Sequence, residues 1–325
     1  MPTGARSSSQ STAVPPARPL PPEDQAPLTD LFASWESLAK QEDLLPPLSP
    51  LATRLLSLDV DDSLATVELA KIVESDPVLT ARILGLANSA AVTRTGKPIY
   101  EVMGAVIRLG AQAVFEAAFA QLAALWLRQS YQLPDKAQLH DLWLEYLLTA
   151  FCSREIADAL DEAEVKEPIA YAAGLLHDVG TLALSCAEPS LMSRFIHAGY
   201  AVGTPLYASF VLAHSALSAA LLQRWGTPAA LVEVAARHHL DATLDQSATV
   251  GVVFLADHLH LRVMAHQRSD FQHKVAAPLG CFDPATDQIN ATLTHLGLAG
   301  EIDAIIGRVA SEGRRIEMLA AAVAS

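Results

Sequence analysis

The sequence has few of the residues that build sheets, disulfide frameworks or aromatic ligand cages. Only 6% of its 325 residues are aromatic, glycine occurs 16 times, and runs of β-branched residues with alternating polarity are almost absent. The three cysteines, Cys152, Cys186 and Cys281, are odd in number and far apart, which argues against a disulfide framework or a zinc ribbon. These absences favour an all-α protein with reduced thiols, and we expect it to be cytoplasmic.

Basic residues are also scarce. Lys and Arg number 22 against 36 Asp and Glu, which gives a formal net charge of −14. Residues 29–150 carry −6 and residues 151–325 carry −8, so neither half is basic. Because binding to nucleic acid or to an anionic membrane surface depends on basic residues, we expect neither as a partner.

Long apolar runs are missing as well. The most apolar stretch that we identify, Ala113 to Leu127, carries Glu116 and Gln121 and is shorter than the roughly 18–20 residues of a membrane span. Residues 1–28 contain no apolar run typical of a secretory signal. The sequence therefore predicts no membrane segment, and the positive mean hydropathy reflects the abundance of alanine.

Proline and glycine divide the chain. Residues 1–28 hold seven of the 19 prolines and a serine-rich patch, and this composition predicts a disordered tail. From residue 29 onward, apolar residues recur at helical spacing. Asp76-Pro77 predicts a helix N-terminus, and Gly110 separates two predicted helices. We expect two packed helical halves, 29–135 and 136–265, the second beginning with a long amphipathic helix (139–159), followed by a helical extension at 266–325.

Histidine and aspartate stand out in four places of the second half. His177-Asp178 follows an apolar helix, His214 precedes the predicted helix 215–225, His238-His239 ends another helix, and Asp257 lies within an apolar run. Imidazole and carboxylate groups together are typical ligands of divalent metals. Taken singly, each residue has a structural explanation, such as capping a helix C-terminus. Their order along the chain is more specific.

That order, together with several segments of the body, resembles the HDOD (HD-related output domain) family of bacterial signalling proteins within the HD superfamily. The similarity spans roughly residues 38–262 and is carried by Leu45–Leu48, Ile72–Leu79, Ile83–Ser89, Ala105–Gly110, Gly174–Gly180, Leu221–Pro228 and Arg237–His239. The resemblance implies an all-α, multi-helix fold in which an N-terminal helical half packs on a degenerate HD-like half. It also implies a regulatory or scaffold role, with other signalling proteins as partners.

The sequence departs from the pattern of working HD hydrolases in two ways. The upstream histidine of the Trp-x-His pattern is replaced by Glu145, and the residue after Gly180 is Thr181, where the related phosphodiesterase branch has lysine. A carboxylate still binds metal, so Glu145 weakens the site without abolishing it. Arg237 or Arg154 could supply the missing cation.

Two interpretations of the constellation stay open. In the first, the histidines and aspartates form a hydrogen-bonded network in the core. In the second, they hold one or two divalent ions (Fe, Mn, Ni, Mg or Zn) as a degenerate site, whose candidate ligands are His177, Asp178, His214, His238, His239, Asp257 and Glu145. The leading hypothesis is a module that binds a protein or a small phosphorylated ligand without catalysis. The alternative is a divergent metal-dependent phosphohydrolase or phosphodiesterase.

Overall fold

The computed structural model of the chain confirms the all-α fold, and its described residues form no strand. These residues are 20–41, 44–58, 63–89, 97–130, 136–160, 165–197, 204–239, 247–267 and 286–324. Cys281 and the first 19 residues of the predicted tail lie outside them.

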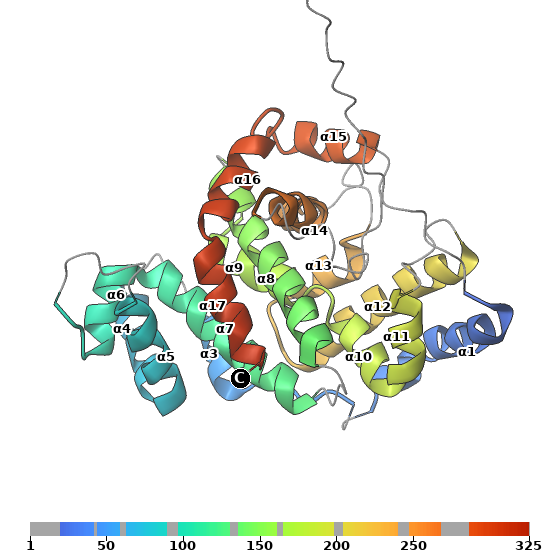
Figure 1. Cartoon of the computed structure of the whole chain (residues 1–325), viewed down its shortest axis with the longest axis horizontal. Helices are drawn as coiled ribbons and strands as arrows, with labels where there is room; N and C mark the ends of the chain where they lie inside the picture. The colour runs from blue at the N-terminus through green and yellow to red at the C-terminus, as the bar shows by residue number, and fades with distance from the viewer. Residues whose placement is uncertain are drawn as a thin grey trace, which may run out of the picture.

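The described segments contain 17 helices, and Figure 1 shows their arrangement. They are α1 (Pro22–Ala33), α2 (Trp35–Ala39), α3 (Pro50–Leu56), α4 (Ser63–Glu74), α5 (Pro77–Ala87), α6 (Val102–Leu109), α7 (Ala111–Ser130), α8 (Lys136–Asp158), α9 (Glu167–Leu176), α10 (Val179–Ala187), α11 (Pro189–His197), α12 (Pro205–Arg224), α13 (Ala229–Arg237), α14 (Ala248–Gln267), α15 (Thr286–His295), α16 (Ile302–Ser311) and α17 (Gly313–Ala324).

Local signals set several helix ends where the sequence predicts them. The Asp76 carboxylate accepts hydrogen bonds from the backbone N–H groups of Val78 and Leu79, at 2.8 and 2.9 Å, and so caps α5. Gly110 has a φ of +86°, a conformation that favours glycine, and the chain bends by 115° between α6 and α7.

The tail prediction is wrong for residues 22–28. Pro22 begins α1, where its ring fits the first turn of a helix. Leu28, Leu31 and Phe32 lie at 3–4 spacing and are buried, and α1 packs against α12. The helix therefore begins seven residues upstream of the predicted start of the body, and the burial of its apolar face outweighs the disorder signal of the prolines.

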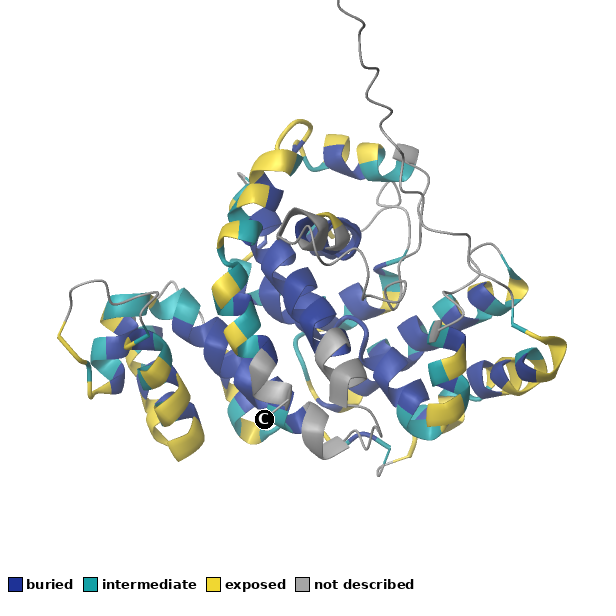
Figure 2. Ribbon diagram, viewed as in Figure 1, coloured by how far each residue is buried: buried dark blue, intermediate teal, exposed yellow. Residues whose placement is uncertain are grey.

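Helix α8 is the centre of the molecule and is not amphipathic as predicted. Every residue from Leu142 to Ala157 is buried, because α9, α14, α16 and α17 surround the helix (Figures 1 and 2). Consequently the polar residues of α8, Glu145, Arg154 and Glu155 among them, must find partners inside the protein.

Two other predictions about helices need correction. The predicted helix 215–225 is the second half of one continuous helix, α12, so His214 lies near its middle and not before a helix start. Helix α10 was not predicted, because its small apolar residues give no stripe. Helices α10 and α12 pack against each other.

Among the described residues, two unbroken helical stretches are long and apolar enough to cross a membrane by length and composition, and the bent pair α6 and α7 would pass the same test as one span. The two unbroken stretches correct the choice of Ala113–Leu127 as the most apolar stretch. They are Glu167–Ala187, which spans α9 and α10, and Pro205–Arg224, which is α12. The apolar window of the first is 89% buried and that of the second 50%. Packing within the protein accounts for the apolar character of the first.

Candidate metal centre

The His177–Asp178 doublet lies at the break between α9 and α10. His177 is the C-cap of α9 and Asp178 the N-cap of α10. The N–H of Gly180 donates to Ser218 Oγ of α12 at 2.8 Å, and a Cβ at Gly180 would lie 2.1 Å from the carbonyl oxygen of His214. Glycine therefore lets α10 begin directly against α12, which places Asp178 Oδ1 3.5 Å from His214 Nε2.

His214 also meets the doublet His238–His239 at the end of α13. Its Nε2 lies 2.8 Å from His239 Nε2 and 3.4 Å from His238 Nε2. Each of the three histidines offers one possible ligand atom, and these three atoms all lie within 4.8 Å of one another. His214 is 24 residues before His238 and 25 before His239 in the sequence, yet the three lie together. We call them the histidine cluster.

The backbone fixes the orientation of three imidazoles. Nδ1 of His177, His214 and His238 lies 2.8–3.0 Å from the carbonyl oxygens of Gly174, Phe210 and Ala235. A carbonyl oxygen only accepts, so each Nδ1 carries the hydrogen, and the neutral rings of His214 and His238 have their lone pairs on Nε2. This is the arrangement in which a histidine binds a metal through Nε2.

Asp257 on α14 completes the group from the other side. Its Oδ1 lies 3.5 Å from His177 Nε2, and both side chains are at most 5% exposed. Burial lowers the pKa of His177, but the hydrogen bond and charge of Asp257 and the charge of Asp178 outweigh burial and raise it. Burial alone would raise the pKa of Asp257. The hydrogen bond and charge of His177 outweigh this effect, so the pKa of Asp257 lies below its usual value.

The histidine cluster itself is held neutral. Burial lowers the pKa of His214, and it lowers the pKa values of His238 and His239 far below the usual range. Burial also raises the pKa of Asp178, although the histidines oppose this. Neutral imidazoles whose Nε2 atoms converge, with a carboxylate beside them, are a donor set that fits a borderline divalent ion.

The structure thus brings six predicted residues together, and Glu145 lies at their edge. Glu145 Oε1 is 4.0 Å from Nε2 of His260, whose Nδ1 is 3.9 Å from Asp257 Oδ1. His260 is fully buried, neither ring nitrogen has a hydrogen-bond partner, and burial lowers its pKa to about 4. The sequence analysis missed His260, although its position three residues after Asp257 places both on one helix face.

Two hydrogen bonds at Asp178 were not predicted from the sequence. Thr181 Oγ1 donates to Asp178 Oδ1 at 2.7 Å, and the Tyr146 hydroxyl donates to the Asp178 carbonyl oxygen at 2.9 Å. No spacing rule in the sequence points to Tyr146, because α8 and α10 meet only in the fold. Thr181 therefore holds the carboxylate of Asp178 in place.

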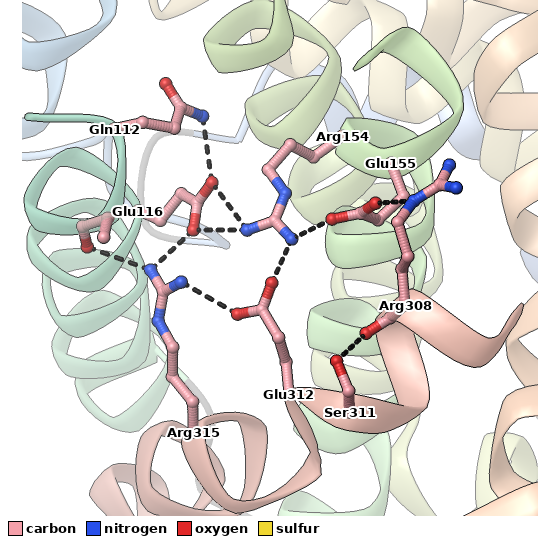
Figure 3. A network of polar contacts seen from close by, with 9 residues as sticks. Gln112, Glu116, Arg154, Glu155, Arg308, Ser311, Glu312 and Arg315 are labelled. Carbon is pink, nitrogen blue, oxygen red and sulfur yellow. Dashed lines mark hydrogen bonds and ion pairs between the residues drawn. The ribbon is translucent and has the colours of Figure 1, made fainter. Parts of the chain in front are cut away.

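The two arginines considered as substitute cations are engaged elsewhere. Arg154 pairs with Glu116, Glu155 and Glu312 (Figure 3), away from the doublet. Arg237 pairs with Glu233 one helical turn back, at 3.7 Å, and both side chains are 34% exposed. These ion pairs direct neither guanidinium toward Asp178.

Comparison with known proteins identifies relatives by sequence family and by fold. A family model described as the HDOD domain matches residues 45–240. That segment contains His177, Asp178, His214, His238 and His239, whereas Asp257 and the C-terminal helices α14–α17 lie beyond it. No curated protein matches the chain.

Three solved structures show the same fold. A protein from Marinobacter aquaeolei VT8 assigned to signal transduction has 23% identity and a TM-score of 0.67, covering 93% of this chain and 67% of its own. An HDOD domain protein of unknown function from Geobacter sulfurreducens has 23% identity and a TM-score of 0.60, covering 90% and 98%. A protein from Shewanella amazonensis SB2B assigned as a phosphohydrolase has 20% identity and a TM-score of 0.58, covering 90% and 97%.

Proposed function

Because the chain belongs to the HDOD domain family, we propose that it is a cytoplasmic bacterial signal-transduction module that acts by binding and not by catalysis. Its partners in this proposal are other signalling proteins, or a small phosphorylated ligand, and include neither nucleic acid nor membrane. The net charge of −14 supports the exclusion of nucleic acid, since phosphate contacts need basic residues.

The observation that carries the non-catalytic role is the position of Thr181. In the resembling phosphodiesterases a lysine follows the glycine of the doublet, whereas here Thr181 is 1% exposed and donates its hydroxyl hydrogen to Asp178. A threonine in that place offers no positive charge to a phosphoester. The buried side chains of His177, Asp178 and Asp257, each at most 5% exposed, further disfavour access by a substrate.

We also propose that the histidine cluster and Asp178 hold one divalent ion. The convergent Nε2 atoms, the neutral imidazoles and the nearby carboxylate support this. Such an ion would supply Lewis acidity and would lower the pKa of a bound water. In the favoured proposal the ion is structural, and it joins α10, α12 and α13.

The second candidate, a divergent metal-dependent phosphohydrolase, is favoured by the same donor set. In that case Asp178 and the histidine cluster would hold the metal, and His177 with Asp257 would hold a proton near it. The two proposals differ in turnover and agree on metal content. Activity is therefore the measurement that separates them.

The test combines metal analysis with turnover assays on the full chain. We expect elemental analysis to find one Fe, Mn, Ni, Mg or Zn ion per chain, and no hydrolysis of bis(p-nitrophenyl) phosphate or cyclic dinucleotides with Mn²⁺ or Fe²⁺ added. Metal should be lost in His214→Ala and kept in His295→Ala, whose histidine is exposed on α15. Turnover that disappears in His177→Ala and Asp178→Ala would establish the hydrolase and overturn the binding role.

A further inference from the structure

His214 is the candidate ligand that contacts both other members of the histidine cluster, and an aromatic ring lies against its face. The ring of Phe210, one turn earlier on α12, stacks on the His214 imidazole with ring centroids 4.5 Å apart and an interplanar angle of 28°. The Phe210 carbonyl oxygen also lies 2.8 Å from His214 Nδ1. Phe210 therefore contacts the imidazole twice, with its backbone at one edge and with its side chain at one face.

These two contacts restrict the imidazole in different ways. The hydrogen bond at Nδ1 fixes the edge of the ring that faces the helix backbone, and it selects the tautomer with the lone pair on Nε2. The stacked phenyl ring limits the tilt of the imidazole plane, because a closely packed core leaves no space for the two rings to turn independently. Together the contacts hold His214 Nε2 at 2.8 Å from His239 Nε2. Metal affinity depends strongly on such contacts behind a ligand.

Phe210 is itself held by rings from two other helices. Its centroid lies 5.5 Å from that of Phe32 on α1 and 5.0 Å from that of Phe195 on α11, and Phe32 and Phe195 meet edge to face at 5.4 Å. All three phenylalanines, which we call the phenylalanine cluster, are at most 2% exposed. Because buried aromatic rings in mutual contact are closely packed, a change in one ring shifts the others.

The phenylalanine cluster connects α1 to the metal centre. Helix α1 packs against both α11 and α12, and it lies before the segment 45–240 that the HDOD family model matches. Phe32 contacts Phe210, and Phe210 contacts His214. A helix outside the matched segment is thus separated from a candidate ligand by a single aromatic ring.

We propose that Phe210 is a positioning residue for the ligand His214, and that α1 sets the metal affinity of the centre through Phe32. This role deepens the proposed ion site and rests on it for every measurement of affinity. The orientation of the imidazole is also a property of the metal-free chain, so the positioning role has a readout of its own.

The first experiment measures the affinity for Co²⁺, by absorbance titration, of the full-length wild type, Phe210→Leu and Phe119→Leu. Leucine keeps an apolar side chain but has no flat face, so we expect Phe210→Leu to bind Co²⁺ about ten-fold more weakly. Phe119→Leu removes a comparably buried ring, which stacks on Phe115 of the same helix, α7, and should bind as the wild type does. Equal affinities of the two variants would overturn the positioning role.

The second experiment observes the imidazole nitrogens by ¹⁵N NMR in chelator-treated chains, and the His214 signal is identified by its absence in His214→Ala. The wild type should show one tautomer, with the hydrogen on Nδ1, and so should Phe119→Leu. Phe210→Leu should show exchange between tautomers, and an unchanged His214 signal in this variant contradicts the proposal. If the wild type binds no metal but the signal changes as expected, the proposed ion is refuted and the positioning role is retained.

A third comparison tests the role of α1. Phe32→Leu should weaken Co²⁺ binding about three-fold, less than Phe210→Leu because it acts through one more ring. Leu28→Ala removes a fully buried aliphatic side chain one turn earlier on α1 and should leave the affinity unchanged. Equal affinities of the two α1 variants would mean that the Phe32 ring has no specific effect, and the role of α1 would be wrong. Phe32→Leu also carries the tautomer measurement if Phe210→Leu fails to fold.

Discussion

Gly180 sets the distance between the His–Asp doublet and α12. The closest atoms to a Cβ at this position would be the His214 carbonyl oxygen at 2.1 Å, Ser218 Oγ at 2.7 Å and Ser218 N at 2.8 Å. Two of these are backbone atoms in the middle of a helix, which cannot move away alone. A side chain at this position would force α10 and α12 apart, and with them Asp178 and His214.

We therefore expect Gly180→Ala to lower the free energy of unfolding by about 3 kcal/mol, as measured by urea denaturation. Gly85→Ala is the matched control, because Gly85 lies inside α5 with no atom within 4 Å of an added Cβ. That variant should be about 0.5–1 kcal/mol more stable than the wild type, since alanine favours the helix. Equal effects of the two substitutions would contradict the close approach of α10 and α12.

At the scale of the element, α5 depends on one capping side chain. The Asp76 carboxylate accepts hydrogen bonds from two backbone N–H groups of the first turn that would otherwise have no partner. Asp76→Ala should cost about 1 kcal/mol in chemical denaturation. Glu101 precedes α6 without a side-chain capping bond, so Glu101→Ala should change stability by less than about 0.5 kcal/mol. A comparable loss in both variants would mean that the Asp76 cap contributes nothing specific.

The same comparison shows which parts of the fold the sequence could predict. Asp76-Pro77 and Gly110 are local signals, and they predict helix boundaries correctly because backbone chemistry alone determines them. The prediction that a helix starts at residue 215 was wrong, because α12 runs on through His214. The amphipathic description of α8 was also wrong, because elements distant in the sequence cover that helix. Periodicity carries little information about a helix that is covered on all sides.

In the candidate site, too, the sequence predicted some residues and missed others whose contacts arise only in the fold. The family resemblance placed six histidines and aspartates in one site, and the structure brings them together, although it leaves their role as ligands untested. It could not place Tyr146, whose proximity to Asp178 results from the packing of α8 against α9. It also missed His260, although the spacing of three residues from Asp257 on α14 is visible in the sequence. The ion pair between Glu116 on α7 and Arg315 on α17 could not be predicted either, since the two residues are 199 positions apart in the sequence.

At the scale of the whole molecule, the candidate ligands come from three helices that pack together and share the hydrogen bond from Gly180 N–H to Ser218 Oγ. Asp178 begins α10, His214 lies within α12, and His238 and His239 end α13. An ion bound by all of them binds the folded chain and not the unfolded one, so it adds to the free energy of unfolding by mass action.

Metal removal tests this coupling directly. With free metal at 100 times its dissociation constant, the stabilisation is about 2.7 kcal/mol, which we expect to raise Tm by about 5 °C relative to chelator-treated protein. The increase should vanish in His214→Ala, which removes the residue shared by both ligand pairs of the cluster, and persist in His295→Ala. A Tm that is identical with and without metal, in protein verified as metal-free by elemental analysis, would leave the histidine cluster as a hydrogen-bonded network of the core. In that case His214→Ala should still lower Tm, because it leaves the Asp178 carboxylate without the imidazole 3.5 Å away.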